Sequence, residues 1–330
     1  MRQEDANARW AICLGCHHRR EVVCERAAGV VLSQAIHDPA RWCPQGKWPA
    51  SGPPPDFSAV SPLDDCFGGK SPIPNPTPKA AILRRNLIYH CCPLRANDGW
   101  QKNLDQLRRR WHVFNGGRKL IAVSLGEGLT ASLGDVAGQL PADAELIAVP
   151  NDPILRETAS LPILLDIIHN NSRLDEATFF AHTKGTSTLA TNYGTMSDSD
   201  RILGATRWRN AMYHHLLDRA DECMERLKLF ACVGTTQMIC SPQRRFRYPS
   251  GLPLKTWMFA GTFFWFRNDA VFSHPGWRRV PKDRYGAEAW LGGLFPPSRS
   301  YSVFQPWDLH TFPAGSPYDP SYYSAEFDES

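Results

Sequence analysis

Hydrophobic and polar positions alternate in blocks along the middle of the chain, and the blocks have the lengths of strands and helices. The apolar run 86–90 has strand length, and the apolar positions after it recur every three or four residues, as on one face of a helix: Trp100, Leu104, Leu107 and Trp111. The turn signal Asn115-Gly116-Gly117 then leads into a second apolar run at 119–125. This order predicts a strand, a helix and a strand, which together form a βαβ unit.

The same alternation continues toward the C-terminus. Apolar runs at 145–149 and 178–181 predict a third and a fourth strand, with a helix between them whose apolar positions are Ile154, Leu161, Leu164, Leu165 and Ile168. A further helix is expected over 208–229, and further strands over 230–233 and 259–266. The pattern predicts an α/β fold with a mostly parallel, Rossmann-like sheet flanked by helices, in which ligands bind at the carboxyl ends of the strands.

A different composition precedes this region. Residues 13–48 hold four of the ten cysteines, and residues 49–78 hold nine prolines. Prolines lack the backbone donor that helices and sheets use, so this stretch is expected to be an extended linker. The sequence therefore predicts a Cys-rich module at 1–48, a Pro-rich linker at 49–80 and an α/β domain at 81–330.

Composition and charge exclude several classes of protein. Of the 330 residues, 42% are hydrophobic, which excludes disorder throughout the chain. The 37 basic and 33 acidic residues give a net charge of +4, which is too balanced for a typical nucleic-acid-binding protein but suits a small anionic ligand. Residues 1–10 lack the apolar segment of a signal peptide, so a cytoplasmic location is expected. The aromatic-apolar run 257–266 is shorter than the roughly 20 residues that span a bilayer.

Four cysteines are candidates for a structural zinc site. Cys13 and Cys16 have the spacing with which a turn binds one tetrahedral ion, and Cys24 and Cys43 complete a set of four, with His17, His18 or His37 as substitutes for a missing ligand. So short a module buries little apolar surface, and a metal would stabilise it. An iron–sulfur cluster or reduced thiols remain alternatives. The module is also a candidate for contact with a membrane surface or a protein partner.

Polar residues follow the predicted fourth strand at its carboxyl end. His182, Thr183, Lys184, Gly185 and Thr186 combine a cation, hydroxyl groups and a glycine that allows close backbone approach. This combination suits the oxygens of a phosphate group, although the Walker pattern is missing. The alternative is that these are ordinary surface residues at the end of a strand.

Two later segments carry further candidates, each with a structural alternative. Gly261 and Thr262 lie where a ligand can approach the backbone and Trp265 can offer its ring to a sugar, but an aromatic run of this kind is usually core packing. Glu288 follows Gly286 and lies beside aromatic residues. That setting suits a proton-accepting carboxylate or an ordinary carboxylate at the start of a helix.

Three other candidates have simple structural explanations. Asp152 follows the third strand, and an N-cap role explains it without a ligand. Trp208 and Arg209 are candidates for substrate contact, although Trp208 also fits the core. The polar stretch Ser197-Asp198-Ser199-Asp200 is expected to be a loop and a candidate lid.

Several of these segments together resemble bacterial glycosyltransferase-like proteins related to the rhamnan-synthesis type. They are, in order, His182-Thr183-Lys184-Gly185, Trp208-Arg209-Asn210-Ala211-Met212-Tyr213, Gly261-Thr262-Phe263-Phe264-Trp265-Phe266-Arg267 and Glu288-Ala289-Trp290, and the resemblance covers residues 84–305. It implies a GT-A fold, whose fourth strand normally ends in an Asp-x-Asp that holds a divalent metal against a nucleotide sugar. This chain has His182-Thr183-Lys184 there instead.

The resemblance implies transfer of a sugar from a nucleotide-sugar donor to a glycan or glycoconjugate acceptor. Lys184 and His182 would neutralise the departing diphosphate, so no catalytic divalent metal is expected, and Glu288 would be the general base. The donor-side residues that it implies are Thr183, Gly185, Thr186, Asp152, Trp208 and Arg209. The acceptor-side residues are Gly261, Thr262 and Trp265.

Two other functions remain open. In the first, a degenerate glycosyltransferase fold and the zinc module are the interaction surfaces of a non-catalytic binding protein, which would keep its partner affinity after Glu288→Gln. The second is a glycoside hydrolase, which needs two opposed carboxylates. Only Glu288 has a suitable setting for that role in the sequence.

Elemental analysis of the purified protein tests the cysteine site. We expect about one zinc ion per chain, because four cysteine ligands form one closed tetrahedral site. Iron with inorganic sulfide would indicate a cluster instead, and a metal-free protein would show that these cysteines are plain thiols.

Overall fold

The computed structural model describes residues 82–173, 175–184, 197–239, 257–306 and 318–328, together with three short strands nearer the N-terminus. The chain divides into two units, Met1–Pro72 and Ile73–Ser330. In the first unit, β1 (Arg19–Arg20), β2 (Val23–Cys24) and β3 (Val30–Val31) form an antiparallel sheet. Cys13, Cys16 and Cys43 lie outside the described residues, so the zinc site stays a prediction.

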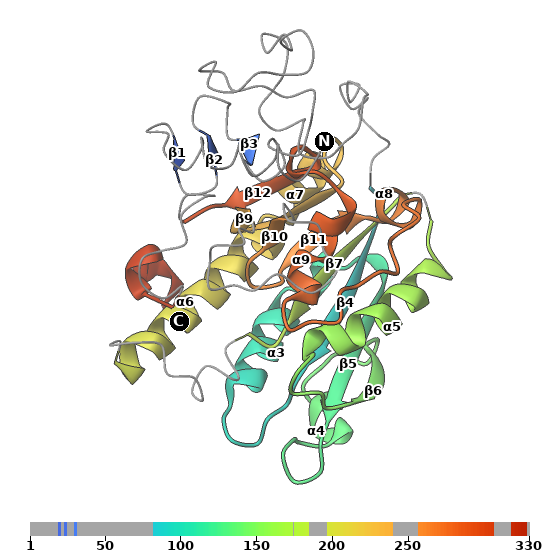
Figure 1. Cartoon of the computed structure of the whole chain (residues 1–330). Coiled ribbons are helices and arrows are strands. Elements are labelled where there is room, and N and C mark those ends of the chain that lie inside the picture. Colours follow the sequence, from blue (N-terminus) through green and yellow to red (C-terminus); the bar gives the residue numbers. More distant parts are fainter. Residues whose placement is uncertain are drawn as a thin grey trace, which may run out of the picture. The chain divides into compact units, whose positions relative to one another are not determined.

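A seven-stranded sheet, ordered β12-β8-β11-β7-β4-β5-β6, is the centre of the second unit (Figure 1). All neighbouring strands are parallel except β11, which is antiparallel to both β7 and β8. The predicted α/β class with a mostly parallel sheet is therefore confirmed. The strands are β4 (Arg84–Cys91), β5 (Gly116–Leu125), β6 (Glu145–Pro150), β7 (Glu176–His182), β8 (Cys232–Thr235), β11 (Phe264–Arg267) and β12 (Ser300–Phe304).

Helices cover both faces of this sheet (Figure 1). On one face lie α3 (Gly99–Arg109), α6 (Asp198–Tyr213) and α7 (Ala220–Leu227), and on the other lie α5 (Glu157–His169), α8 (Asn268–Phe272) and α9 (Gly286–Leu294). Shorter helical elements are η4 (Trp111–Val113), α4 (Leu133–Ala137), η7 (Pro297–Arg299), η8 (Pro320–Tyr322) and η9 (Ala325–Phe327).

Side chains of the central strands alternate between the two layers of helices. Phe179 of β7 packs in the cluster that includes α3 and α6, whereas Phe180 packs in the cluster that includes α5 and α9. Both phenylalanines are fully buried. A strand covered on both faces is mostly apolar, which explains the apolar run that predicted β7.

The apolar run 259–266 does not form the single strand that we predicted. Its first part belongs to β10 (Trp257–Phe259), which pairs with β9 (Gln237–Ile239) in a separate sheet, and β11 begins only at Phe264. Between them, Gly261 and Thr262 have left-handed φ angles of 96° and 61°, which are incompatible with a strand. Because β11 is antiparallel to β7, this turn lies near the carboxyl end of β7.

The long helix predicted over 208–229 has different bounds. It begins at Asp198 as α6, passes through a π-helical turn η6 (His214–Asp218) and ends at Leu227 as α7. Ser197 accepts a hydrogen bond from the Asp200 N–H and caps α6. The stretch expected to be a loop and lid is therefore the start of a helix.

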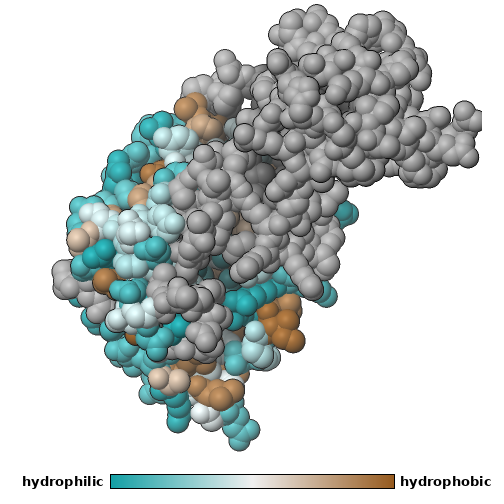
Figure 2. Space-filling model, turned by 60° about the vertical axis from the view of Figure 1, so that its left-hand side comes forward, coloured by the Kyte–Doolittle hydropathy of each residue, from teal (hydrophilic) through white to brown (hydrophobic). Residues whose placement is uncertain are grey.

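The described surface is mostly polar on the face shown in Figure 2, where hydrophobic residues form small separate groups. Large exposed hydrophobic side chains come from different segments, as Leu83, Ile154 and Ile202 illustrate. In the part of the chain that the structure describes, no helix is long and apolar enough to cross a membrane.

Candidate functional site

Two parallel strands end side by side at the place where the strand order of the sheet reverses. The chain passes from β4 to β5 and β6 on one side, and then returns to add β7 on the other side of β4. His90 of β4 is paired with His182 of β7 at this edge. In open α/β sheets, ligands bind outside the carboxyl ends of the strands at such a reversal. The candidate site is therefore at the ends of β4 and β7.

The backbone that follows β7 is fixed from two sides. The Thr183 N–H donates to the His90 carbonyl at 3.0 Å, and the Cys92 N–H donates to Thr183 Oγ1 at 3.0 Å. On α3, the buried side-chain amide of Asn103 donates to the Lys184 carbonyl at 2.8 Å and accepts from the Lys184 N–H at 3.1 Å. These bonds define where the Lys184 side chain begins.

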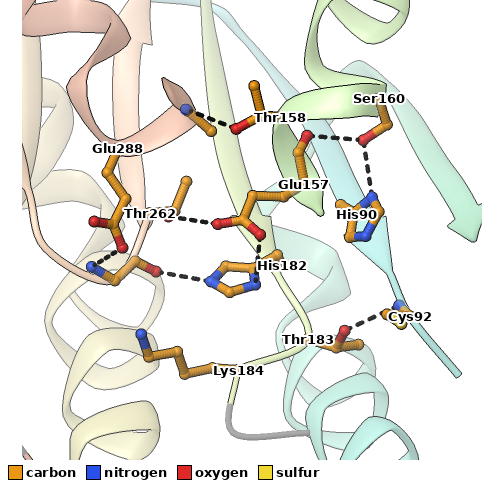
Figure 3. Close-up of polar contacts among 12 residues, drawn as sticks. His90, Cys92, Glu157, Thr158, Ser160, His182, Thr183, Lys184, Thr262 and Glu288 are labelled. Atoms are coloured by element: carbon orange, nitrogen blue, oxygen red, sulfur yellow. Dashed lines mark hydrogen bonds and ion pairs between the residues drawn. The ribbon is translucent and has the colours of Figure 1, made fainter. Parts of the chain in front are cut away.

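Lys184 carries a buried positive charge. The residue is 8% exposed, and its Nζ lies 3.9 Å from the ring centroid of Trp208, which is 3% exposed. A cation over the face of a tryptophan is attracted by the ring electrons, and the attraction increases when water is excluded. Figure 3 shows the lysine reaching from the end of β7 toward the side of the site where Thr262 and Glu288 lie.

The Gly261–Thr262 turn packs against the same tryptophan. A Cβ added at Gly261 would lie 2.9 Å from Met212 Sδ and 3.2 Å from Trp208 Cζ2, so both the left-handed φ and the close packing favour glycine. Thr262 adopts its left-handed angle although it is β-branched, at a cost of about 1–3 kcal/mol. Its Oγ1 donates to Glu157 Oε1 at 3.3 Å, which helps to hold the strained turn.

Glu288 lies in the first turn of α9 and contacts this turn from the other side. Its Oε1 accepts a hydrogen bond from the Gly261 N–H at 3.1 Å (Figure 3). The start of α9 is fixed in turn by the Ala287 N–H, which donates to Thr158 Oγ1 on α5 at 3.1 Å. Burial raises the pKa of Glu288, and the nearby Glu157 carboxylate adds to this effect, whereas Lys184 and the Gly261 N–H oppose it. A carboxylate with a raised pKa is suited to accept a proton near neutral pH.

His182 and Glu157 face each other beneath the turn (Figure 3). His182 Nε2 lies 3.1 Å from the Gly261 carbonyl, which can only accept, so this nitrogen carries the proton; Nδ1 lies 3.9 Å from Glu157 Oε2. Burial lowers the pKa of His182, and the positive charge of Lys184 lowers this pKa further. The Glu157 carboxylate acts in the opposite direction and raises it.

The two carboxylates of the site have pKa values shifted in opposite directions. Burial raises the pKa of Glu157, but its electrostatic interactions with His182, His90 and Lys184 and a backbone hydrogen bond outweigh this effect, so that the pKa is lowered overall. The pKa of Glu288 is raised. Two carboxyl groups separated in this way are able to take different roles in proton transfer.

Sequence reasoning did not single out Glu157, His90 or Arg156 as site residues. His90 was a polar residue at the end of an apolar strand, which is the one local signal that could have found it. Arg156 precedes α5 with φ 53° and ψ −128°, an unusual backbone conformation for any residue but glycine. Within the described ranges its guanidinium makes no hydrogen bond or ion pair, and its charge lowers the pKa of both Cys92 and His182.

The structure contradicts the prediction that Trp265 lies on an acceptor side. Trp265 is fully buried, and its Nε1 donates to the Leu216 carbonyl at 2.8 Å. Side chains alternate along β11, and this one points into the core beneath η6 and packs on Phe179. The aromatic side chain of Trp265 is therefore part of the core, which was the alternative to a sugar-binding role.

The predicted donor-side residues have different positions. Trp208 and Arg209 are buried on α6, and the ring of Trp208 lies against the Lys184 ammonium, so contact of either residue with a donor stays a prediction. Asp152 Oδ1 accepts from the N–H groups of Ile154 and Leu155 and closes the turn before α5, so it is not the cap of that helix. Thr183 belongs to the strand end described above, and Gly185 and Thr186 lie outside the described residues.

Comparisons with known proteins give a distant structural likeness. A solved structure, described as that of an active-site mutant of LgtC, is similar with a TM-score of 0.29 and 11% sequence identity, over 66% of this chain and 72% of that chain. No protein-family model and no curated protein sequence matches the chain.

His90 predicts how stability depends on pH. It is 4% exposed, its Nδ1 lies 2.9 Å from Ser160 Oγ, and burial is the main cause that lowers its pKa from 6.5 to about 4. Between these values the unfolded chain binds more protons than the folded one, so stability falls as the pH is lowered through this window. The loss attributable to His90 is about 3 kcal/mol in total. Urea unfolding between pH 7 and pH 4 measures it.

Variants isolate this contribution. His90→Gln should show a smaller loss of unfolding free energy on acidification than the wild type, whereas a substitution at exposed His112, His112→Gln, should leave the loss unchanged. Equal pH dependence in His90→Gln and wild type would contradict the assignment of a buried neutral His90.

Proposed function

We propose that this chain is a nucleotide-sugar-dependent glycosyltransferase that acts on a hydroxyl group of a glycan or glycoconjugate. The observation that carries the proposal is the approach of Lys184 and Glu288 to the Gly261 turn at the carboxyl edge of the sheet. One group is a buried cation suited to a diphosphate, and the other is a carboxylate with a raised pKa suited to a proton. The sequence resemblance described above is consistent with this combination.

In this proposal the donor diphosphate binds where the strand order reverses. Lys184 neutralises the charge that develops on the diphosphate as it leaves. Arg156 is a second cation for the same anion, because its charge acts on residues at the ends of β4 and β7. Thr183 and Asn103 keep the lysine backbone in place and are assigned no chemical step.

The reaction has one group transfer and one proton transfer. The acceptor oxygen forms a bond to the anomeric carbon of the donor sugar, and the bond between that carbon and the diphosphate oxygen breaks. The diphosphate takes the electron pair of the broken bond and leaves as an anion. Glu288 takes the proton of the acceptor hydroxyl.

His182 has a different role in this proposal from the one the sequence suggested. Its lowered pKa favours a neutral imidazole near pH 7, so the charge that faces the diphosphate is assigned to Lys184 and Arg156. The Nε2–H of His182 and the hydroxyl of Thr262 instead hold the turn whose N–H contacts Glu288. These residues position the base.

A divalent metal does not fit the end of β7. Mg²⁺ and Mn²⁺ prefer several carboxylate or carbonyl oxygens, whereas this strand ends in His182, Thr183 and the ammonium of Lys184. The nearby carboxylates already bind other groups, since Glu157 accepts from Thr262 and Glu288 accepts from Gly261. Within the described ranges, no group of three or more His, Cys, Asp and Glu side chains could hold a metal ion. In the proposed reaction, Lys184 takes the place of a metal ion at the end of β7.

A panel of UDP-, GDP- and dTDP-sugars in the presence of EDTA tests the proposal. We expect one donor to bind and to be hydrolysed slowly, and to be used for transfer once an acceptor is supplied. Glu288→Gln should lower the turnover about 10²- to 10⁴-fold with donor binding retained, because it removes only the general base. The matched variant Glu225→Gln changes an exposed glutamate on α7 and should keep full activity.

The pH dependence of the reaction rate is a second test with the same variant. The wild-type rate should rise with pH through a pKa above the ordinary 4.5 of glutamate, because burial keeps Glu288 protonated to higher pH. This rise of the rate with pH should be absent from the Glu288→Gln variant. Binding without turnover would favour a non-catalytic protein, and full dependence on added manganese would contradict the assigned role of Lys184.

A further inference from the structure

The C-terminal segment 318–328 packs along α6 on the side of the helix that carries Trp208. Arg207 donates to both carboxylate oxygens of Asp328, at 2.5 and 3.0 Å, and to the Pro320 carbonyl at 3.1 Å. One helical turn on, Asn210 Nδ2 donates to the Phe327 carbonyl at 2.9 Å. The segment is thus attached to α6 at both of its short helical turns, η8 and η9.

The backbone of this segment comes unusually close to α6 at one point. A Cβ added to Gly204 would lie 1.6 Å from the Tyr318 carbonyl oxygen, so only glycine allows this approach. Gly204 is one helical turn before Trp208, and the approach brings the Tyr318 ring within 5.5 Å of the Trp208 ring, centroid to centroid.

A second tyrosine of the segment stacks on the same tryptophan. The rings of Tyr323 and Trp208 are 6.4 Å apart with an interplanar angle of 17°, and Tyr323 is 4% exposed. Offset stacking of this kind is favourable and fixes the orientation of the rings. Trp208 therefore contacts the C-terminal segment as well as Lys184 and the position of Gly261.

We propose that the C-terminal segment positions Lys184 through Trp208. Tyr318 and Tyr323 hold the indole ring, and the ring holds the ammonium group at the end of β7. The tyrosines are positioning residues and contact no substrate. That the positioned lysine contacts the leaving diphosphate rests on the proposed function. The physical coupling between Tyr323 and Lys184 is independent of that function.

Chemical labelling of lysines in the intact protein measures this coupling without any assay of activity. The rate of reductive methylation is followed for each lysine by peptide mass spectrometry in wild type, Tyr323→Ala and Tyr323→Phe. Lys119, whose side chain is 12% exposed and paired with Asp143, and Lys102, whose side chain is 43% exposed, are internal references.

We expect Lys184 to be methylated about tenfold faster in Tyr323→Ala, because a loosened tryptophan no longer holds the cation over its ring. Tyr323→Phe keeps the ring and should leave the rate unchanged, and the rates of Lys119 and Lys102 should not change in either variant. Asp328→Asn weakens the attachment to Arg207 and should raise the Lys184 rate about twofold, as expected for a partly exposed ion pair. This milder variant decides the question if Tyr323→Ala does not fold.

Two results would overturn the proposal. One is a Lys184 rate that stays at the wild-type value in Tyr323→Ala or, if that variant does not fold, in Asp328→Asn. The other is an equal rise at Lys119 and Lys184, which indicates general destabilisation. Once an active donor is known, Tyr323→Ala should lower kcat and leave KM for the acceptor unchanged. A wild-type protein without transferase activity would count against the proposed function and not against the coupling between Tyr323 and Lys184.

Discussion

Burial of the Lys184 charge is the constraint on which the rest of the candidate site depends. An ammonium group removed from water costs several kcal/mol unless its surroundings compensate for it. Here the compensation comes from the face of Trp208 and from Glu157 and Glu288, on whose pKa values the lysine charge acts. These three residues belong to α6, α5 and α9, so one charge at a strand end connects both layers of helices with the sheet.

Gly261 is where these elements meet. Its N–H donates to Glu288, its carbonyl accepts from His182, and its Cα lies against Trp208. The turn is strained at Thr262, and strain of this kind persists only where the surrounding contacts determine the backbone. The carboxylate, the histidine and the lysine therefore have positions that depend on one another, although α9 is far from β7 in the sequence.

Local patterns in the sequence predicted the parts of the fold that have local causes. Continuous apolar runs identified β4, β5, β6 and β7, of which β4 and β7 are buried along most of their length. The same rule failed for the aromatic run around Gly261, where the chain changes sheets. The acceptor-side role of Trp265 was expected from its ring and from the resemblance, but the side chain is buried in the core. His182, Lys184 and Glu288 were found as polar residues at element ends, but Glu157 becomes a site residue only through packing between elements.

A crystal structure with bound nucleoside diphosphate, from soaks of UDP, GDP and dTDP in the presence of EDTA, would show whether Lys184 contacts the leaving group. We expect the terminal phosphate of one of them to lie within hydrogen-bond distance of Lys184 Nζ, at the ends of β4 and β7, with no metal ion between them. A diphosphate bound elsewhere, with Lys184 still covered by Trp208 and away from the ligand, would contradict it.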